Sequence, residues 1–339
     1  MARVGIREVA TLAGVSVGTV SHYLNHPSRV SPEKSERIQR AIDKLGFVRN
    51  NAAWQLRLGR STTIAYIVPD VSNPFFAAIA EGVEQRAAAH DLSVFIANPN
   101  RSRAREDAYL EMFQAQRVQG LLVASHEPIE DRLITLRQRG VPSVLVGQRG
   151  TFADQPSVSV DDVAGGRMAA AHLLELGRSR IAFVGGPLGI RQVADRLDGA
   201  GSVIGQSAEG TLEVINVAHR TIAEGRAVAR LLAARRPQRR PDAVFAVNDL
   251  IALGLIQELV LGHGIRVPED IAVIGYDDIE FAESSLIPLS SIRAPHEEFG
   301  HTAVDLLVDE MGEEPRDSPS QMVFQPVLVP RASTLGAAG

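Results

Sequence analysis

The feature that most constrains the fold is an alternation of short apolar runs and longer helical stretches between residues 62 and 330. The near-continuous apolar character of the runs is typical of parallel strands covered on both faces. Repeated strand–helix–strand order predicts a parallel α/β sheet, and eight or more strands in about 270 residues favour two doubly wound halves over one sheet. The expected strands are 62–68, 92–97, 120–125, 142–147, 180–185, 212–217, 243–248 and 271–276. The expected helices lie around 75–90, 103–116, 162–176, 221–235, 249–262 and 296–311.

The first sixty residues show helical periodicity without strand-like runs, and they predict a small all-α headpiece. Gly14 ends a first amphipathic helix, and Ser16 is placed to cap a second helix at 17–24. Ser31 and Pro32 then suit the N-cap and first position of a third helix. That helix carries apolar residues at helical spacing and is followed by a glycine, namely Ile38, Ala41, Ile42, Leu45 and Gly46.

Residues 6–25 predict a helix-turn-helix. Ala10 is small where the helices would cross, Gly14 permits the turn, and Val15 anchors it, while Val20 and Leu24 supply buried positions. The second helix of such a motif can enter the major groove of DNA. An unrelated three-helix packing domain would show the same periodicity and is the alternative.

Charge is distributed unevenly along the chain. Residues 1–60 hold ten basic and four acidic residues, whereas 61–339 hold 25 basic and 36 acidic residues. This asymmetry indicates that only the headpiece meets a polyanion. Chance clustering is the alternative, because 33 of the 35 basic residues are arginines, which hints at a GC-rich genome.

Four motifs carry a resemblance that covers residues 6 to about 334: AGVSVGTVSHYLN, VSPEKSERIQRAIDKLGF, IVPDVSNPFF and VIGYDD. Their identity and order resemble the lactose-repressor (LacI/GalR) family of bacterial transcription regulators. The resemblance implies a helix-turn-helix headpiece at 1–48, a hinge helix or linker at 49–61, and a core at 62–334. The core would be two-lobed and periplasmic-binding-protein-like, and it would bind an effector and form a homodimer.

The second helix of the headpiece supplies most of the expected DNA contacts. Val17, Gly18 and His22 would face bases. His22 departs from the arginine of many family members, which can hold guanine bidentately, so the flanking operator bases are not predictable. Phosphate or groove-wall contacts are expected from Ser16, Thr19, Ser21 and Asn25, and Arg7 and Ser31 complete the expected DNA-binding set.

The hinge holds an unusual leucine, since Leu56 lies among polar and basic neighbours. The resemblance implies that paired hinge helices of a dimer drive Leu56 into the minor groove as a wedge, accompanied by Asn50 and Ala53. The alternative is a linker helix that packs Leu56 on the core.

Ligands of two-lobed α/β cores lie beyond the carboxyl ends of the strands. The resemblance implies that Arg196 and Asp277 anchor the ligand, while rings at 75 and 245 stack on it. There are alternatives to ligand binding. The phenylalanines could simply pack in the core, and Arg196 could form an interlobe ion pair with Asp277 that needs no ligand. Ile190, which replaces an arginine of purine-responsive members, argues for a sugar or sugar derivative. The expected effector contacts are Phe75, Ser125, Gln192, Arg196, Phe245, Asn248 and Asp277.

The preferred function is a transcriptional repressor controlled by a small effector. No leucine heptads follow LVPRASTLGAAG, so a dimer and a palindromic DNA operator are expected. A solute-binding protein is the second hypothesis, but the basic headpiece and the lack of a signal peptide or anchor cysteine speak against it.

An enzyme is the third hypothesis. The chain has no cysteine, no G-x-S-x-G elbow, no Walker A loop and no H-E-x-x-H motif. The acidic pairs at 161–162 and 277–278 are more typical of helix caps or solvated loops than of catalysis. We therefore expect no catalytic residues, no metal and no cofactor. Because no apolar run reaches 18 residues, we expect no membrane association and a cytoplasmic, nucleoid-associated protein.

Overall fold

The computed structural model describes residues 4–47, 61–312 and 320–336. The chain divides into two compact units, residues 1–61 and residues 62–339. The first unit holds the headpiece and the second holds the core.

The headpiece consists of three helices and one short 3₁₀ turn. Gly14 ends the first helix in the left-handed region at φ +64°, which glycine adopts without strain. Ser16 caps the second helix as predicted, because its Oγ accepts a hydrogen bond from the Thr19 N–H at 3.0 Å. Ser31 precedes the third helix, but no hydrogen bond of its hydroxyl caps it among the described residues. The elements are α1 (Ile6–Ala13), α2 (Val17–Asn25), η1 (Pro27–Arg29) and α3 (Pro32–Leu45).

The apolar residues of the three headpiece helices form one small core. Its buried members are Val9, Ala10, Ala13, Val20, Ile38 and Ala41, and Val15 and Leu24 pack against them. The residues that the helix-turn-helix pattern assigns to the interior are therefore the ones that pack in this core.

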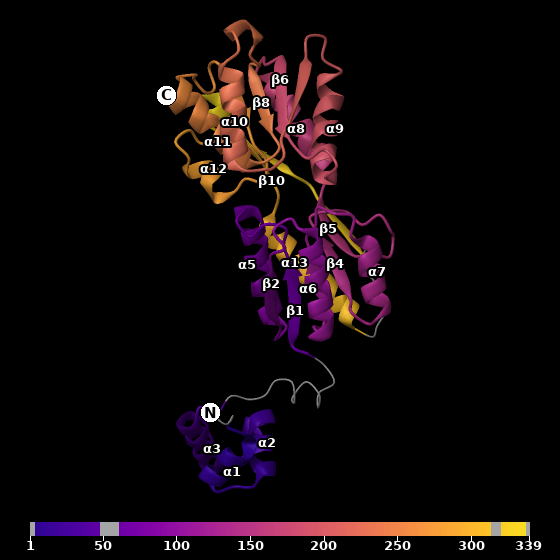
Figure 1. Cartoon of the computed structure of the whole chain (residues 1–339), viewed down its shortest axis with the longest axis vertical. Coiled ribbons are helices and arrows are strands. Elements are labelled where there is room, and N and C mark those ends of the chain that lie inside the picture. The colour runs from indigo at the N-terminus through magenta and orange to yellow at the C-terminus, as the bar shows by residue number, and fades with distance from the viewer. Residues whose placement is uncertain (1–3, 48–60, 313–319, 337–339) are drawn as a thin grey trace. The chain divides into compact units, whose positions relative to one another are not determined.

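The core unit contains two parallel sheets, as the sequence predicts. The first has the strand order β11-β5-β4-β3-β1-β2, and the second has the order β7-β6-β8-β9. We call the half built on the first sheet lobe 1 and the half built on the second sheet lobe 2 (Figure 1). Lobe 1 contains β1 (Thr63–Ile67), β2 (Ser93–Ala97), β3 (Leu121–Val123), β4 (Ser143–Val146), β5 (Ser157–Val160) and β11 (Gln321–Phe324). Lobe 2 contains β6 (Arg180–Gly185), β7 (Thr211–Asn216), β8 (Ala243–Ala246) and β9 (Ala272–Ile274).

Helices cover both faces of the sheet in lobe 1. Alternate residues of β1 point to opposite faces, so that Ile64 and Tyr66 join one apolar cluster while Ala65 and Ile67 join the other. The first cluster is completed by α5 (Pro74–Ala89) and α13 (His296–Met311), and the second by α6 (Arg103–Ala115) and α7 (Glu130–Gln138).

Lobe 2 has a single continuous apolar core around β6, β8 and β9. The predicted helix over 249–262 is helical throughout, as an α-helix over Asp249–Gln257 and a π-helix over Glu258–Gly262. The helical elements of this lobe are α8 (Asp162–Glu175), α9 (Arg191–Ile204), α10 (Ile222–Ala233), η2 (Pro237–Arg239), α11 (Asp249–Gln257), η3 (Glu258–Gly262), α12 (Glu280–Ser284) and α14 (Ala332–Leu335).

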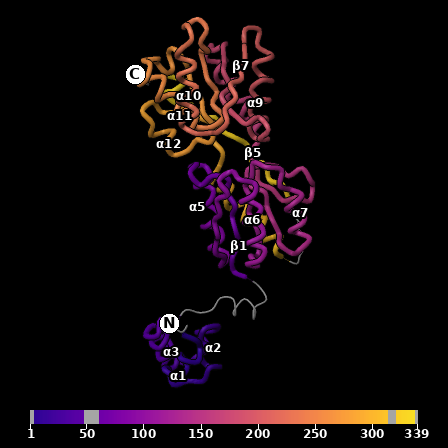
Figure 2. The backbone as a smooth tube through the Cα atoms, in the orientation of Figure 1, coloured from indigo at the N-terminus to yellow at the C-terminus, as the bar shows by residue number. Residues whose placement is uncertain are grey.

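The backbone passes between the lobes three times, as the tube in Figure 2 shows. It leaves lobe 1 after β5, returns to it in α13, and leaves it again after β11. Between these passages lies an antiparallel ribbon of β10 (Ser291–Arg293) and β12 (Val327–Val329). No helix in the described parts of the chain is both long and apolar enough to cross a membrane.

Glycines let the helices of lobe 2 cross at very short distances. A Cβ on Gly199 of α9 would lie 2.1 Å from the Val163 carbonyl oxygen, and one on Gly166 of α8 would lie 2.1 Å from the Arg196 carbonyl oxygen. At these crossings α8 and α9 pack backbone against backbone, which leaves no room for a residue larger than glycine. The close packing brings Asp162, at the start of α8, next to the side chain of Arg196.

Candidate functional site

The exposed surface of the headpiece includes the first turn of α2. Val17 is 42% exposed, and Gly18 and His22 are also exposed. The hydroxyl groups of Ser16 and Thr19 form a hydrogen bond, with 2.8 Å between their oxygens. The structure therefore exposes to solvent the three residues that are expected to face bases, whereas Val20 of the same helix is buried. Of the other expected DNA contacts, Ser21 and Asn25 are half-buried on α2, and Arg7 and Ser31 are exposed on α1 and before α3.

The hinge prediction cannot be compared with the fold. Asn50, Ala53 and Leu56 lie outside the described residues.

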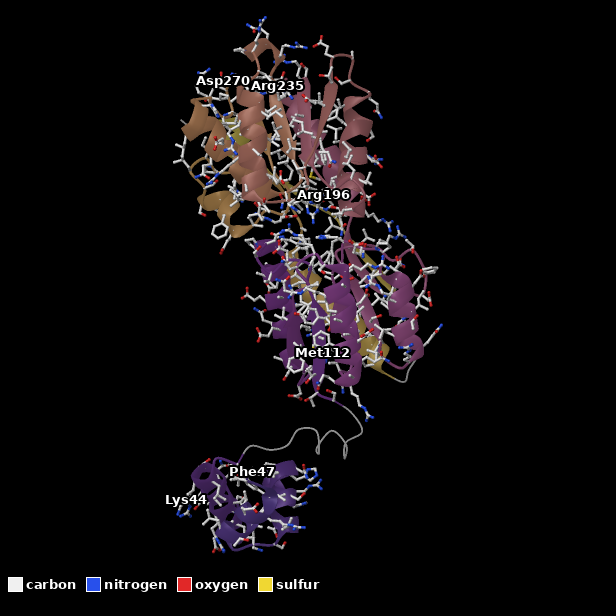
Figure 3. All side chains as sticks on the ribbon, in the orientation of Figure 1. Lys44, Phe47, Met112, Arg196, Arg235 and Asp270 are labelled. Atoms are coloured by element: carbon white, nitrogen blue, oxygen red, sulfur yellow. The ribbon has the colours of Figure 1, made fainter. Side chains whose placement is uncertain are left out.

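A cleft of about 700 Å³, including the solvent at its mouth, lies where the two lobes meet. Its walls are the segments that follow the carboxyl ends of strands in both sheets, which is where open α/β folds bind ligands. Figure 3 labels Arg196 at this junction. The cleft is lined by Pro69, Asp70, Asn73, Phe75, Phe76, Arg101, Ala124, Ser125, His126, Val146, Gly147, Ile190, Gln192, Val193, Arg196, Arg220, Asn248 and Asp277.

Arg196 is fixed by four contacts in lobe 2. Its Nε donates to Asp162 Oδ1 at 2.8 Å, and its Nη1 donates to the Val247 carbonyl oxygen at 2.6 Å. Nη1 also lies 3.7 Å from Asp277 Oδ1, and the guanidinium stacks 3.5 Å from the ring centre of Tyr276. Burial acts to lower the pKa of Arg196, but the charges of Asp162, Tyr276 and Asp277 and the hydrogen bond to Asp162 together outweigh it, and the pKa is raised. Arg196 and Asp277 therefore pair within lobe 2, and not between the lobes.

Asp277 follows β9 and is 4% exposed. Its backbone adopts φ +100°, a conformation that side-chain-bearing residues rarely accept. Burial raises its pKa to about 7, although the charge of Arg196 opposes the shift. A carboxyl group with this pKa can both donate and accept hydrogen bonds near neutral pH.

A second buried carboxyl group stands behind Asp277. Asp249 accepts hydrogen bonds from the Ser291 hydroxyl at 2.6 Å and from the Ile279 N–H at 2.8 Å. Burial and the neighbouring Asp277 raise its pKa. Asp249 does not line the cleft and serves to hold the loop after β9.

Arg101, His126 and Arg220 also line the cleft, and none of them was predicted from the sequence. Arg101 pairs with Asp70 in lobe 1, and the Asp70 carboxylate also accepts from the Ser72 hydroxyl at 2.6 Å. Nη2 of Arg220, in lobe 2, lies 3.0 Å from Nδ1 of His126, in lobe 1. The signal was available, because Arg101, His126 and Arg220 follow the carboxyl ends of three strands that the sequence does predict.

Hydrogen bonds connect the two lobes across the cleft. Gln192 on α9 donates through Nε2 to the Gly147 carbonyl oxygen at 2.8 Å. Next to it, Arg191 donates to the Arg149 carbonyl oxygen at 3.0 Å. The contact of Arg220 with His126 is a third connection. Gln192 thus lines the cleft as expected and also joins its walls.

The two phenylalanines expected to stack on a ligand have different positions. Phe75 lines the cleft and packs edge to face against His296, with ring centres 5.2 Å apart. Phe245, by contrast, does not line the cleft. It is 1% exposed in β8, where its ring packs edge to face against Phe183, because this central parallel strand is buried on both faces.

Two further predicted residues line the cleft and also shape its walls. The Ser125 Oγ accepts from the Glu127 N–H at 3.0 Å. Asn248 caps α11, because its Oδ1 accepts from the Ile251 N–H at 3.1 Å. Among the described residues, no group of histidine and acidic side chains is arranged to hold a metal ion.

Comparison with known proteins covers both units of the chain. Residues 5–50 match bacterial regulatory proteins of the lacI family, and residues 170–334 match the periplasmic binding protein-like domain. The chain is 31% identical over 331 residues to the ribose operon repressor of Escherichia coli (strain K12), covering 97% of this chain and 99% of that protein.

Solved structures show the same similarity. The complex of the transcriptional regulator CelR with cellobiose is 32% identical, covers 98% of this chain and 100% of that one, and has a TM-score of 0.71. The lac repressor dimer bound to operator and the anti-inducer ONPF is 26% identical, covers 98% and 100% of the two chains, and has a TM-score of 0.83.

Proposed function

The chain belongs to the LacI family of bacterial regulatory proteins, and on this premise we propose that it represses transcription under the control of a sugar-like ligand. A regulator of this family is not an enzyme. The ligand would bind in the cleft between the lobes and change the affinity of the headpiece for a palindromic operator. In this proposal, residues 1–48 bind the DNA and residues 49–61 form the hinge. Residues 62–334 bind the ligand and form the dimer. The proposed location is the cytoplasm, at the nucleoid.

The observation that carries this proposal is the chemistry of the cleft. Polar groups of both lobes converge there, and Phe75 offers an apolar ring beside them. Carboxylates, guanidinium groups and amides recognise hydroxyl groups through directional hydrogen bonds, while a ring covers the apolar face of a sugar. Two relatives point the same way, since one is named for ribose and the other is complexed with cellobiose.

A second copy of the chain is the proposed partner of the core. Large apolar side chains are exposed on β2, where Phe95 is 52% and Ile96 51% exposed, and on α6, where Met112, labelled in Figure 3, is 42% exposed. The two elements adjoin, because Phe95 stacks on Phe113 of α6. Exposed apolar surface that gathers on adjoining elements marks an interaction site. The lac repressor structure is a dimer, which supports a homodimer here.

The test is binding of the full-length protein to DNA upstream of its own gene, over a salt series, with and without a panel of sugars. We expect palindrome-specific binding that weakens with salt, because phosphate contacts release counterions, and that one sugar changes markedly. Sequence-blind binding that no sugar alters would contradict the proposal.

Asp277→Ala is the variant that separates the two sites. We expect it to bind the operator as the wild type does and to lose its response to the sugar. If this variant unfolds the core instead, Asp277→Asn preserves the side-chain shape and takes its place. Loss of operator binding by a folded variant would contradict the assignment of Asp277 to the ligand cleft.

A further inference from the structure

We propose that the ligand of the cleft carries an acid group, a carboxylate or a phosphate monoester, and that Arg220 receives it. The inference rests on the proposed function and names the class of ligand for the same cleft. It is carried by one arginine that no residue in the described part of the chain pairs with an opposite charge.

Arg220 lies in lobe 2 after β7 and lines the cleft. Its Nη1 donates to the Gly186 carbonyl oxygen at 3.1 Å, and its Nη2 lies 3.0 Å and 3.3 Å from the two ring nitrogens of His126. Within the described part of the chain, its Nε–H has no hydrogen-bond partner. Both partners of this guanidinium are thus neutral groups, and donor capacity is left over.

The other two arginines of the cleft are paired with carboxylates. Arg101 pairs with Asp70, and Arg196 pairs with Asp162 at 2.8 Å and with Asp277 at 3.7 Å. Arg220, by contrast, forms no ion pair with any residue that the structure describes. Among the arginines that line the cleft, Arg220 is therefore the one without a carboxylate partner in the described residues.

His126 does not supply the missing charge. Burial, together with the charge of Arg220, lowers the pKa of His126 to about 3, so its ring is neutral at physiological pH. Burial and the charges of Arg101 and Arg196 lower the pKa of Arg220 to about 10, despite the opposing influence of Asp277 and Asp70. Arg220 still carries its charge at neutral pH, close to two other cations.

A half-buried cation without a counter-ion is destabilising, because burial removes part of its hydration. A ligand anion would restore the balance, and the planar guanidinium fork matches both carboxylates and phosphates. Asp277 and Asn248 line the same cleft and suit hydroxyl groups. The ligand class that fits both features is a sugar acid or a sugar phosphate.

Arg220 has one competing role, because it also connects the lobes. Its role could be limited to joining Gly186 of lobe 2 to His126 of lobe 1, without any contact to a ligand. Arg191 offers a matched control, since it also connects the lobes through the Arg149 carbonyl oxygen but does not line the cleft.

The experiment is isothermal titration of the full-length protein with matched ligands. Glucose, galactose and ribose are each compared with the corresponding sugar acids and sugar phosphates. We expect the wild type to bind an acidic member at least about tenfold tighter than its neutral parent, which is typical of a charge-assisted hydrogen bond. Arg220→Gln should abolish this preference and keep the affinity for the neutral sugar, whereas Arg191→Gln should keep the preference. Thermal melting confirms that each variant is folded.

The outcomes separate this inference from the proposed function. Tighter or equal binding of a neutral sugar by the wild type would overturn the acid group and leave the sugar-controlled repressor intact. An equal loss of acidic and neutral ligands in Arg220→Gln would show that Arg220 only joins the lobes, and would overturn the assignment. If no member of the panel bound, the sugar class of the proposed function would fall, and this inference with it. The sugar-acid and sugar-phosphate arms distinguish a carboxylate from a phosphate.

Discussion

At Asp277 both the backbone and the side chain are held in unfavourable states. The backbone is at φ +100°, and the carboxyl group is buried beside Asp249, whose own pKa is also raised by burial. Strain of this kind persists only where the surrounding structure enforces it, and it concentrates at ligand sites. The bonds of Asp249 to Ser291 and Ile279 hold the loop in place.

The raised pKa of Asp277 gives the core a pH-dependent stability. Because burial raises this pKa from 3.8 to about 7, the folded chain keeps a proton over a pH range in which the unfolded chain has released it. The contribution of Asp277 to the free energy of unfolding should therefore fall as pH rises from about 4 to 7, by up to about 1.4 kcal/mol per pH unit. Asp277→Asn should flatten that slope, as measured by urea unfolding of the ligand-free protein at several pH values.

Asp270 provides a control of opposite sign. The hydrogen bonds from Arg266 lower the pKa of Asp270 to about 2, so its contribution is present above its ordinary pKa and is lost as pH falls below about 4. Asp270→Asn should therefore lower the free energy of unfolding by a constant amount between pH 4 and 7, which leaves the slope there unchanged, and its difference from the wild type should shrink in acid. An identical slope in wild type and Asp277→Asn would refute the assignment to Asp277.

Phe75 and Phe245 should respond differently to truncation. Phe245→Leu removes ring contacts with Phe183 inside lobe 2 and should lower the free energy of unfolding by about 1–3 kcal/mol. Phe75→Leu lies at the cleft and should mainly weaken ligand binding. Urea unfolding and ligand titration of both variants test the contrast, which fails if Phe245→Leu is as stable as the wild type and binds ligand more weakly.

The residues of the cleft show how far sequence reasoning extends at this scale. Arg196 and Asp277 could be assigned because family motifs surround them. Arg220 could not, because its role depends on which charges are already paired, and pairs such as Arg101 with Asp70 join segments far apart in the chain. Phe245 was placed in the cleft because it lies near a strand end, whereas all residues of β8 are buried in the apolar core of lobe 2.

At the scale of elements, three helix pairs share one packing device. In α8 with α9, α10 with α11, and α5 with α13, a glycine of each helix lies against the backbone of the other. The pairs are Gly166 with Gly199, Gly225 with Gly254, and Gly82 with Gly300. In the first pair this packing sets the position of Arg196 relative to Asp162, so the glycines contribute to the site without lining it.

Two glycines of α9 should therefore tolerate alanine unequally. A Cβ on Gly199 would lie 2.1 Å from a backbone oxygen, so Gly199→Ala must push α8 and α9 apart and should cost about 1–3 kcal/mol or more. A Cβ on Gly201 meets only a leucine methyl group at 3.7 Å, so Gly201→Ala should be neutral or stabilise the helix by up to about 1 kcal/mol. Urea unfolding decides, and equal stability of the two variants would contradict the close crossing.

The elements that the sequence predicts are the ones with strong local signals. All eight expected strands are present, with ends that differ by at most two residues. The strands that were missed lack such signals, because β5 (Ser157–Val160) alternates serine with valine and β10 and β12 have only three residues each. β11 pairs with β5 over more than 160 residues of sequence, a contact that no local pattern encodes.

At the scale of the whole core, two lobes are joined by three backbone passages and by hydrogen bonds across the cleft. Gln192, Arg191 and Arg220 of lobe 2 each contact lobe 1. A ligand that replaces or reinforces these contacts would favour one arrangement of the lobes over another. The cleft is therefore placed where small ligand contacts can change the relation between two large bodies.

If the cleft controls the headpiece, the two sites must be coupled reciprocally. A ligand that changes operator affinity by a given factor must have its own affinity changed by the same factor when operator is bound, and couplings of about 5- to 150-fold are typical. We expect fluorescence anisotropy of labelled operator, with and without ligand, and ligand titration, with and without operator, to give one common factor. Asp277→Ala, which loses the ligand, should retain the operator affinity of the ligand-free protein. Tight ligand binding that leaves operator affinity unchanged would separate the cleft from repression, because a ligand with equal affinity for both states shifts no equilibrium.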